Sequence, residues 1–310
     1  MKKTIGIDIG GTKICAAVIQ NGQIISDIKS FKTPKTTKEI LETLFKAIEE
    51  LKTSSKVDFV GIATAGAVDI NNSKVIGSTG NLPEGYNKLD LKEEIEKKFG
   101  LITFVENDAN AAAYAEYKIG ASKGHQNTIT VTLGTGIGGG IIVNGQLLRG
   151  KSGAAAEIGH IQLSWKNERQ CTCGAWDCWE SYASGTGFAK NAVEMAKQLP
   201  EFKHSVLKDH NIDELTTHDV IQGHKNNDAF CNLVHERWEK LVLMGLLALA
   251  NIFDPESIVL SGGMAQFINF KKLEEKVNSE IVTNPIKLLH AKAGNHAGMI
   301  GAALLAEEKL

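Results

Sequence analysis

Apolar positions follow two periods along the chain, and each period predicts one kind of element. Residues 4–31 have the pattern of a strand, a Gly-Gly turn, a strand, an Asn-Gly turn and a third strand, and residues 128–149 repeat that plan. The tripeptide Asn-Gly-Gln stands in both copies, at residues 21–23 and 144–146. Asn-Gly is typical of two-residue hairpins, because both central turn positions need a positive φ. Two such hairpins in the same context indicate two related domains.

Helices and strands alternate after each copy. Apolar residues at helical spacing predict helices over residues 38–52, 91–99, 109–118, 186–198, 235–253 and 295–308. Apolar runs predict strands over residues 57–63, 101–105 and 257–260. This alternation is typical of an α/β protein. No linker interrupts it, so the domain boundary is soft and is expected near residues 116–124.

Composition narrows the class of protein. The chain has 310 residues, 43% of them hydrophobic, and a formal net charge of -2. That length favours two domains, and the near-neutral charge gives no footprint for nucleic acid or an anionic membrane. Glycines and Asp8 interrupt the N-terminal apolar run before it reaches the length of a signal peptide. The longest apolar run, residues 241–253, is shorter than the ~20 residues of a membrane span. We therefore expect a cytoplasmic protein.

Three of the 5 cysteines, Cys171, Cys173 and Cys178, stand within the segment CTCGAWDCWE. In a reducing compartment such a cluster indicates metal binding or catalysis rather than disulfides. His160 completes a Cys₃His set, which is common in structural zinc sites. The C-x-C-x₄-C spacing differs from paired C-x-x-C motifs, so reduced cysteines without metal remain the alternative. Thiols so close together and without a metal would be prone to oxidation.

Glycine-rich turns follow three predicted strands. Gly10 and Gly11 come after Asp8 and precede Thr12 and Lys13, so backbone N–H groups and two side chains could meet a phosphate there. An ordinary tight hairpin is the alternative. The second turn contains Gly134, Thr135 and Gly136, and the third contains Gly262 and Gly263. Three such turns in two related halves indicate a bound nucleotide.

A dinucleotide-binding motif is the competing interpretation of the second turn. Gly134, Gly136 and Gly139 match G-x-G-x-x-G. That motif must open a helix, whereas a predicted strand and hairpin follow here. No Walker-type P-loop sequence occurs either. The context therefore argues against a nicotinamide dehydrogenase and against a P-loop enzyme.

Asp108 lies where a predicted strand meets an Ala-rich helix, which suits a base for phosphoryl transfer to a hydroxyl. A helix cap at Asn107 or Asp108 is the alternative. Glu157 and His160 are three residues apart and would share a face of a helical turn. Together with Glu180 after the cysteines, these side chains offer hydrogen-bond partners for the hydroxyls of a sugar.

Five motifs in order resemble the ROK family of sugar kinases and repressors across essentially the full chain. They are IGIDIGGTK, ENDANAAAYAE, TLGTGIGGG, EIGH and CTCGAWDCWE. The resemblance implies an actin-like, hexokinase-like fold of two ribonuclease-H-like α/β domains with a cleft between them. Residues 1–117 with 295–310 would form the smaller domain, with the first phosphate segment and the base. Residues 118–294 would form the larger one, with the second phosphate segment, the zinc site and the adenosine site.

The resemblance also implies a role for each site residue. Asp108 would be the base. The sugar contacts would be Gly66, Asn81, Asn107, Asp108, Glu157, His160 and Glu180. The contacts to ATP and Mg²⁺ would be Asp8, Gly10, Gly11, Thr12, Lys13, Gly134, Thr135 and Gly136, with Gly262 and Gly263 near the adenosine. The zinc ligands would be His160, Cys171, Cys173 and Cys178.

The implied activity is transfer of the γ-phosphate of ATP to the 6-hydroxyl of a hexose, with glucose first because CWESYASG resembles the glucokinases of the family. N-acetylmannosamine, N-acetylglucosamine, fructose, mannose and allose stay open, as does a non-catalytic sugar sensor. The sequence lacks the N-terminal DNA-binding segment of the repressors, and a homodimer is expected because relatives form one. Two departures are Asp177, where many members have glycine, and Ala65, where many have proline before the glycine.

Overall fold

A computed structural model describes residues 2–76 and 82–308, which form two compact units. The first unit takes the described residues of Met1–Thr130, Gly139–Ala156 and Ala291–Leu310, and the second takes Val131–Gly138 and Glu157–His290. Strands β7 (Thr128–Leu133) and β8 (Ile137–Val143) have residues in both units. The predicted division into residues 1–117 with 295–310 and 118–294 therefore stays a prediction.

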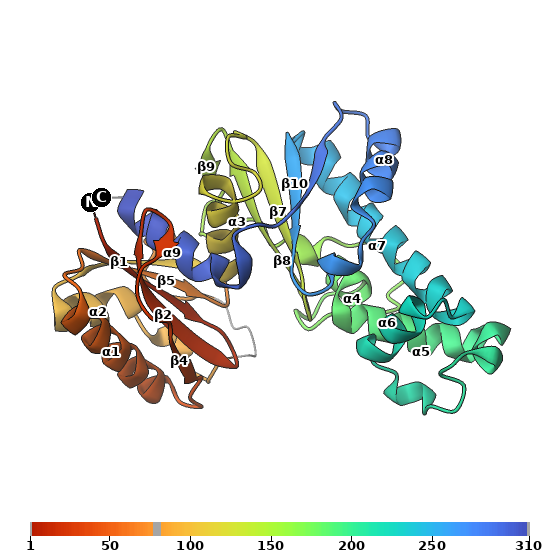
Figure 1. The fold of residues 1–310 in the computed structure, drawn as a ribbon, viewed down its shortest axis with the longest axis horizontal. Coiled ribbons are helices and arrows are strands. Elements are labelled where there is room, and N and C mark those ends of the chain that lie inside the picture. Colours follow the sequence, from red (N-terminus) through yellow and green to blue (C-terminus); the bar gives the residue numbers. More distant parts are fainter. Residues whose placement is uncertain (1, 77–81, 309–310) are drawn as a thin grey trace. The chain divides into compact units, whose positions relative to one another are not determined.

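The first unit contains a six-stranded sheet with the order β3-β2-β1-β5-β6, in which β4 also pairs with β2 (Figure 1). Its strands are β1 (Thr4–Ile9), β2 (Lys13–Gln20), β3 (Gln23–Ile24), β4 (Lys29–Lys32), β5 (Phe59–Thr64) and β6 (Ile102–Asn107). Its helices are α1 (Thr37–Ser54), α2 (Leu91–Phe99), α3 (Asp108–Lys118) and α9 (Ala297–Glu308). β1 runs antiparallel to β2 and parallel to β5, which runs parallel to β6.

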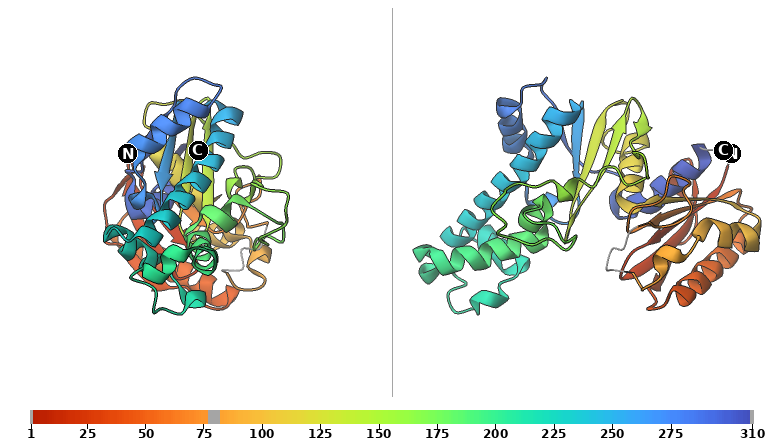
Figure 2. Two further views of the ribbon diagram at one scale, coloured as in Figure 1. Left: turned by 90° about the vertical axis from the view of Figure 1, so that its right-hand side faces the viewer. Right: turned by 180° about the vertical axis from the view of Figure 1, so that it is seen from behind.

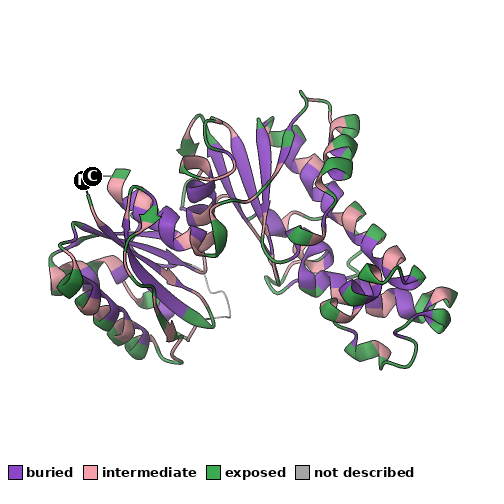
Figure 3. Cartoon of the chain, in the orientation of Figure 1, coloured by how far each residue is buried: buried purple, intermediate pink, exposed green. Residues whose placement is uncertain are grey.

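Both faces of this sheet are covered by helices. Even-numbered residues of β2 from Ile14 to Val18 lie in one core with the apolar faces of α1 and α2. Odd-numbered residues from Cys15 to Ile19 lie in another core with α9 and with Ala115 of α3. This alternation follows from the two-residue period of a strand, and Figure 3 shows the strands as buried. Burial on both faces explains why these strands are continuous apolar runs.

The second sheet has the order β11-β10-β7-β8-β9. Besides β7 and β8 it contains β9 (Gln146–Leu147), β10 (Ser257–Ser261) and β11 (Lys287–His290). The remaining helices are α4 (Trp179–Ala183), α5 (Gly185–Gln198), α6 (Thr217–Lys225), α7 (Ala229–Phe253) and α8 (Phe270–Glu280). Helices α5, α6 and α7 lie side by side (Figure 2).

Two buried tryptophans join the helices of the second unit. The indole N–H of Trp179 in α4 donates to the carbonyl of Leu241 in α7 at 2.8 Å. The indole N–H of Trp238 in α7 donates to the carbonyl of Ala183 at 2.7 Å, and its ring meets that of Phe188 edge to face. A buried Trp needs such an acceptor for its N–H. These bonds fix α4, and with it the position of Glu180, against the long helix α7.

The two sheets share one strand order, which confirms the predicted internal repeat. Read from the hairpin end, β3-β2-β1-β5-β6 corresponds to β9-β8-β7-β10-β11. Both Asn-Gly turns have the predicted positive φ, at 52° and 74° for Asn21 and Gly22 and at 49° and 74° for Asn144 and Gly145. The fold is therefore built from two copies of one α/β plan.

The third strand of the first copy was predicted to be longer than it is. Hydrogen bonding of β3 ends after Ile24, and the Ser26 hydroxyl accepts the N–H of Val18 at 2.9 Å. The chain then returns to β2 as β4. Other predicted elements are present, with ends that differ by a few residues. Helices α4, α6 and α8 and strand β11 were missed. No helix of the described residues is long and apolar enough to cross a bilayer.

Candidate functional site

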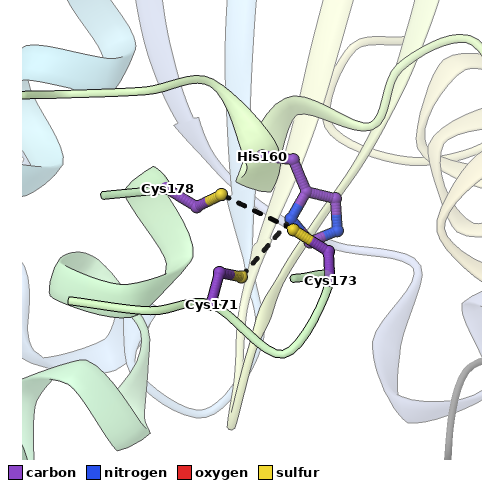
Figure 4. Close-up of side chains that lie close together, drawn as sticks. All are labelled: His160, Cys171, Cys173 and Cys178. Atoms are coloured by element: carbon purple, nitrogen blue, oxygen red, sulfur yellow. Dashed lines mark hydrogen bonds between the residues drawn. The ribbon is translucent and has the colours of Figure 1, made fainter. Parts of the chain in front are cut away.

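One cluster of side chains in the second unit suits a metal ion. The ligand atoms of His160, Cys171, Cys173 and Cys178 all lie within 4.8 Å of one another (Figure 4). Cys171 Sγ is 3.7 Å from His160 Nδ1, and the sulfurs of Cys173 and Cys178 are also 3.7 Å apart. A tetrahedral zinc site with Zn–S bonds of about 2.3 Å has edges of about 3.8 Å. The four predicted ligands therefore fit zinc in number, type and spacing.

The thiols of this cluster differ in acidity. Burial raises the pKa of the Cys171 thiol, but hydrogen bonds from the backbone and side chain of Cys173 outweigh this and lower it to about 7. Burial, together with the neighbouring thiols, raises the pKa of Cys178 to about 12. Zinc binds thiolates, so binding must release a proton from the second of these cysteines. Three thiols and one imidazole are nevertheless a donor set that zinc commonly binds.

Asp177 organises the loop that carries the cysteines. Its carboxylate accepts the backbone N–H groups of Asn167, Glu168 and Arg169 at 2.8, 3.1 and 2.9 Å, and the Tyr182 hydroxyl donates to it at 2.7 Å. Burial raises the pKa of this carboxyl, but the Tyr182 hydroxyl and the backbone donors outweigh burial and hold it below its ordinary value.

Asp177 also has a φ of 56°, a left-handed conformation that favours glycine. Glycine in many relatives would therefore suit the same turn. Aspartate adopts this conformation here, and its carboxylate accepts four hydrogen bonds that glycine could not.

The predicted sugar ligands of the second unit lie around this cluster. Glu157 Oε2 is 3.9 Å from His160 Nε2, the ring nitrogen that does not face Cys171. Glu157 is exposed and His160 is partly exposed. Glu180 Oε1 is 3.9 Å from Cys171 Sγ, while Oε2 accepts the N–H of Ile137 at 2.8 Å. The structure thus places Glu157 and Glu180 beside the four candidate zinc ligands, of which His160 is also a candidate sugar ligand.

Two of the three glycine turns also lie in the second unit. The turn of Gly134, Thr135 and Gly136 connects β7 to β8, so a strand follows it and the dinucleotide motif fails as predicted. Gly262 follows β10 with a φ of 86° and lies so close to the backbone of Leu133 that no side chain would fit. The N–H of Met264 donates to the Leu133 carbonyl at 3.0 Å. The second and third turns are therefore neighbours at the ends of adjacent strands.

The first glycine turn lies in the first unit, between β1 and β2. The N–H of Gly10 donates to the carbonyl of Lys13 at 3.1 Å, and Gly11, Thr12 and Lys13 are exposed. Asp8 stands at the end of β1. Burial raises its pKa, and the charges of His296 and Lys13 oppose that shift. A carboxylate in this setting is suited to a cation such as Mg²⁺, directly or through water.

The start of α3 separates the roles of Asn107 and Asp108. Asn107 is the cap, since its side-chain oxygen accepts the N–H of Asn110 at 3.0 Å, and its amide donates to the carbonyl of Gly66 at 3.1 Å. Asp108 is the first helical residue, and its Oδ1 accepts the N–H of Ala109 at 2.8 Å. Because Asn107 is the cap, the need for a helix cap does not explain the aspartate at position 108. Asn81 lies outside the described residues.

A buried ion pair that the sequence did not reveal supports this helix start. Glu106 is 1% exposed, and its Oε1 accepts the N–H of Asn107 at 3.0 Å and the side-chain amide of Asn110 at 3.1 Å. Its Oε2 pairs with the Arg149 guanidinium, which also donates to Asn72 and lies over the Phe104 ring. Burial lowers the pKa of Arg149, and Glu106 opposes that shift. The pair fixes the backbone from which Asn107 and Asp108 project.

The fold and these sites indicate the class of protein. Two sheets of one strand order, each with a glycine turn after its first strand, are typical of actin-like kinases. The chain belongs to the ROK family, whose model matches residues 4–309. It is 36% identical to a glucokinase from Streptomyces coelicolor over 99% of this chain and 98% of that protein.

Solved structures agree. A ROK family glucokinase from Streptomyces griseus, in complex with glucose and AMPPNP, matches with a TM-score of 0.80 and 34% identity over 99% of both chains. A ROK hexokinase from Thermus thermophilus matches with a TM-score of 0.83 and 28% identity over 99% of this chain and 98% of its own. A relative with another printed activity, an N-acetylmannosamine kinase from Haemophilus influenzae, is 29% identical over 99% of this chain and 96% of its own.

We expect the purified protein to contain zinc and Cys178→Ser to lose it, because a tetrahedral site needs all four ligands. Zinc content by mass spectrometry and loss of zinc to a chelator measure this. Cys231→Ala is the matched control, since Cys231 is buried in α7 and is not among the ligands. Equal zinc content in the two variants would contradict the assignment of Cys178 as a zinc ligand.

We expect both Asp177→Asn and Asp177→Gly to lower Tm and to speed zinc loss, because each removes the charged acceptor of three N–H groups and one hydroxyl. The pKa of Asp177 is depressed, so its contribution to stability is present above about pH 4 and is lost as pH falls through the folded value. The difference in Tm from wild type should therefore shrink below that pH. A Gly variant as stable as wild type would show that only the left-handed turn matters.

Arg149→Met should destabilise the first unit by about 3–5 kcal/mol, because it leaves the Glu106 carboxylate buried without its counter-charge. Urea unfolding measures this. Adding Glu106→Gln to Arg149→Met should recover part of the loss, since the buried charge is then gone. If the double variant is as unstable as the sum of the singles, the ion pair is not the cause.

Proposed function

We propose that this protein is an ATP-dependent hexose kinase that transfers the γ-phosphate of ATP to the 6-hydroxyl of a sugar, with glucose as the preferred substrate. The observation that carries the proposal is Asp108. It is the first residue of α3, directly after the cap Asn107, in a chain that matches glucokinases along its whole length. Phosphoryl transfer asks a protein mainly for positioning and for a base near the attacking hydroxyl.

Asp108 would accept the proton of the 6-hydroxyl as that oxygen attacks the phosphorus in line. Asn107 would orient the sugar through its second amide hydrogen, since the first is bonded to Gly66. Glu157 and Glu180 would accept hydrogen bonds from other hydroxyls, and His160, with Nδ1 on zinc, would donate one from Nε2–H. A sugar that lacks one of these hydroxyls would leave a polar group unpaired. Asn81 remains a further candidate contact.

The three glycine turns would bind the nucleotide. Thr12, Lys13 and the backbone amides of both phosphate turns would hold the phosphates, and Gly262 and Gly263 would lie near the adenosine. Mg²⁺ would neutralise phosphate charge when bound, with Asp8 near it. Zinc on His160, Cys171, Cys173 and Cys178 would hold the sugar-binding loop without touching the transferred phosphate. A cytoplasmic homodimer is the expected form.

A sugar sensor is the second candidate, because a Bacillus subtilis xylose repressor is 29% identical over 96% of this chain and 75% of its own. A sensor needs to bind sugar but needs no base. The candidate base is present here, which favours the kinase. Among kinases, the similarity to glucokinases favours glucose over the acetamido sugars, fructose, mannose and allose.

We expect sugar-dependent ADP release with Mg-ATP, measured by a coupled assay across hexoses and acetamido-hexoses, and fastest with glucose. Asp108→Asn should lower kcat by about 10²–10⁴-fold while the sugar still binds, because only the proton acceptor is removed. Asp209→Asn on the surface is the control. Sugar binding without turnover in the wild type would favour the sensor, and activity on an acetamido sugar alone would change the substrate.

A further inference from the structure

The Glu180 carboxylate contacts both the zinc loop and the second phosphate turn. Oε2 accepts the N–H of Ile137 at 2.8 Å, and Oε1 lies 3.9 Å from Cys171 Sγ. Ile137 is 6% exposed and directly follows the turn of Gly134, Thr135 and Gly136. An N–H group makes one strong hydrogen bond, so the N–H of Ile137 is committed to Glu180 rather than to a phosphate.

Gly136 lacks a side chain because Glu180 occupies the space. A Cβ on Gly136 would lie 3.1 Å from Cδ of Glu180 and closer still to Oε2. Gly134 differs, since a Cβ there would meet only the carbonyl oxygen of Gly136, at 3.9 Å. Neither glycine is among those with positive φ. Backbone conformation therefore does not explain Gly136, whereas close approach of the carboxylate does.

The opposite side of Ile137 is also in contact with a segment that carries sugar ligands. Gly159 lies in the short 3-10 helix of Ile158–His160, and a Cβ there would clash with the carbonyl of Ile137. The N–H of Ile137 thus donates to Glu180, and its carbonyl lies in close contact with the Glu157–His160 segment. A movement of the turn must move at least one of these segments.

We propose that Gly136 and the N–H of Ile137 are positioning groups for Glu180, so that the second phosphate turn sets the affinity for sugar. The inference rests on the proposed function, in which Glu180 binds a sugar hydroxyl. It gives Gly136 a second role beside the predicted phosphate contact, because the missing side chain leaves room for the Glu180 carboxylate. It also links the two substrates, since a nucleotide that shifts this turn must alter sugar affinity, and sugar must alter nucleotide affinity by the same factor.

The test compares Gly136→Ala with Gly134→Ala, the same substitution two residues apart. Glucose, or the hexose that the activity panel identifies, is titrated by calorimetry without nucleotide. Gly136→Ala should weaken sugar binding about tenfold or more, because the charged hydrogen bond at Glu180 is displaced, and Gly134→Ala should change it less than about twofold. Unchanged sugar affinity in Gly136→Ala, or equal losses in both variants, would overturn the proposal.

A double-mutant cycle with Glu180→Ala covers the case in which Gly136→Ala folds poorly. Glu180→Ala removes the clash, so Gly136→Ala should lower Tm in the wild-type background and have little effect in the Glu180→Ala background. Additive changes in Tm would overturn the link. Tm is measured without ligand, so this cycle tests the contact between Gly136 and Glu180 even if the wild type binds no sugar. Absence of sugar binding in the wild type would itself count against the proposed function.

Discussion

A carboxylate that leaves water must find hydrogen-bond donors, and this requirement fixes the loops of this protein. Glu106 accepts a backbone N–H at the start of α3, and Asp177 accepts three in the cysteine loop. Glu180, which is partly exposed, accepts one directly after the glycine turn of residues 134–136. Glu116 accepts the N–H groups of Ala121, Lys292 and Ala293. A buried acceptor left without donors would cost more than the bond itself contributes, so each of these contacts specifies a backbone position.

Asp177 and the cysteine cluster order the same loop. Asp177 holds three consecutive N–H groups before Cys171 and lies next to Cys178, so it shapes the loop from both ends. Trp179 lies between Cys178 and Glu180, and its hydrogen bond to Leu241 of α7 fixes this part of the loop. A metal ion at the four ligands would add a crosslink to a loop that hydrogen bonds already order. That arrangement gives a rigid support for Glu180 and His160, which a selective sugar site needs.

The repeat of one strand order in two sheets places chemistry at matching points. In each copy a glycine turn follows the first strand and an Asn-Gly hairpin follows the second. The copies then diverge. The first turn is exposed and has a partly buried aspartate before it, whereas the second is occupied on one side by Glu180. The glycine turns at matching places in the two sheets therefore differ in what their glycines make room for.

The sequence by itself determined the α/β class, the internal repeat, most helices and strands, and the cluster of His160 with three cysteines. These features depend on local periods, on turn residues that need positive φ, and on ligand types at short spacing, all of which a single chain displays. Only the tertiary structure decided the partners of the buried charges. Ile137 is 43 residues from Glu180, and Arg149 is 43 residues from Glu106 and 77 from Asn72. No local pattern encodes such pairs, because they exist only once the packing of helices on the sheets has brought distant segments together.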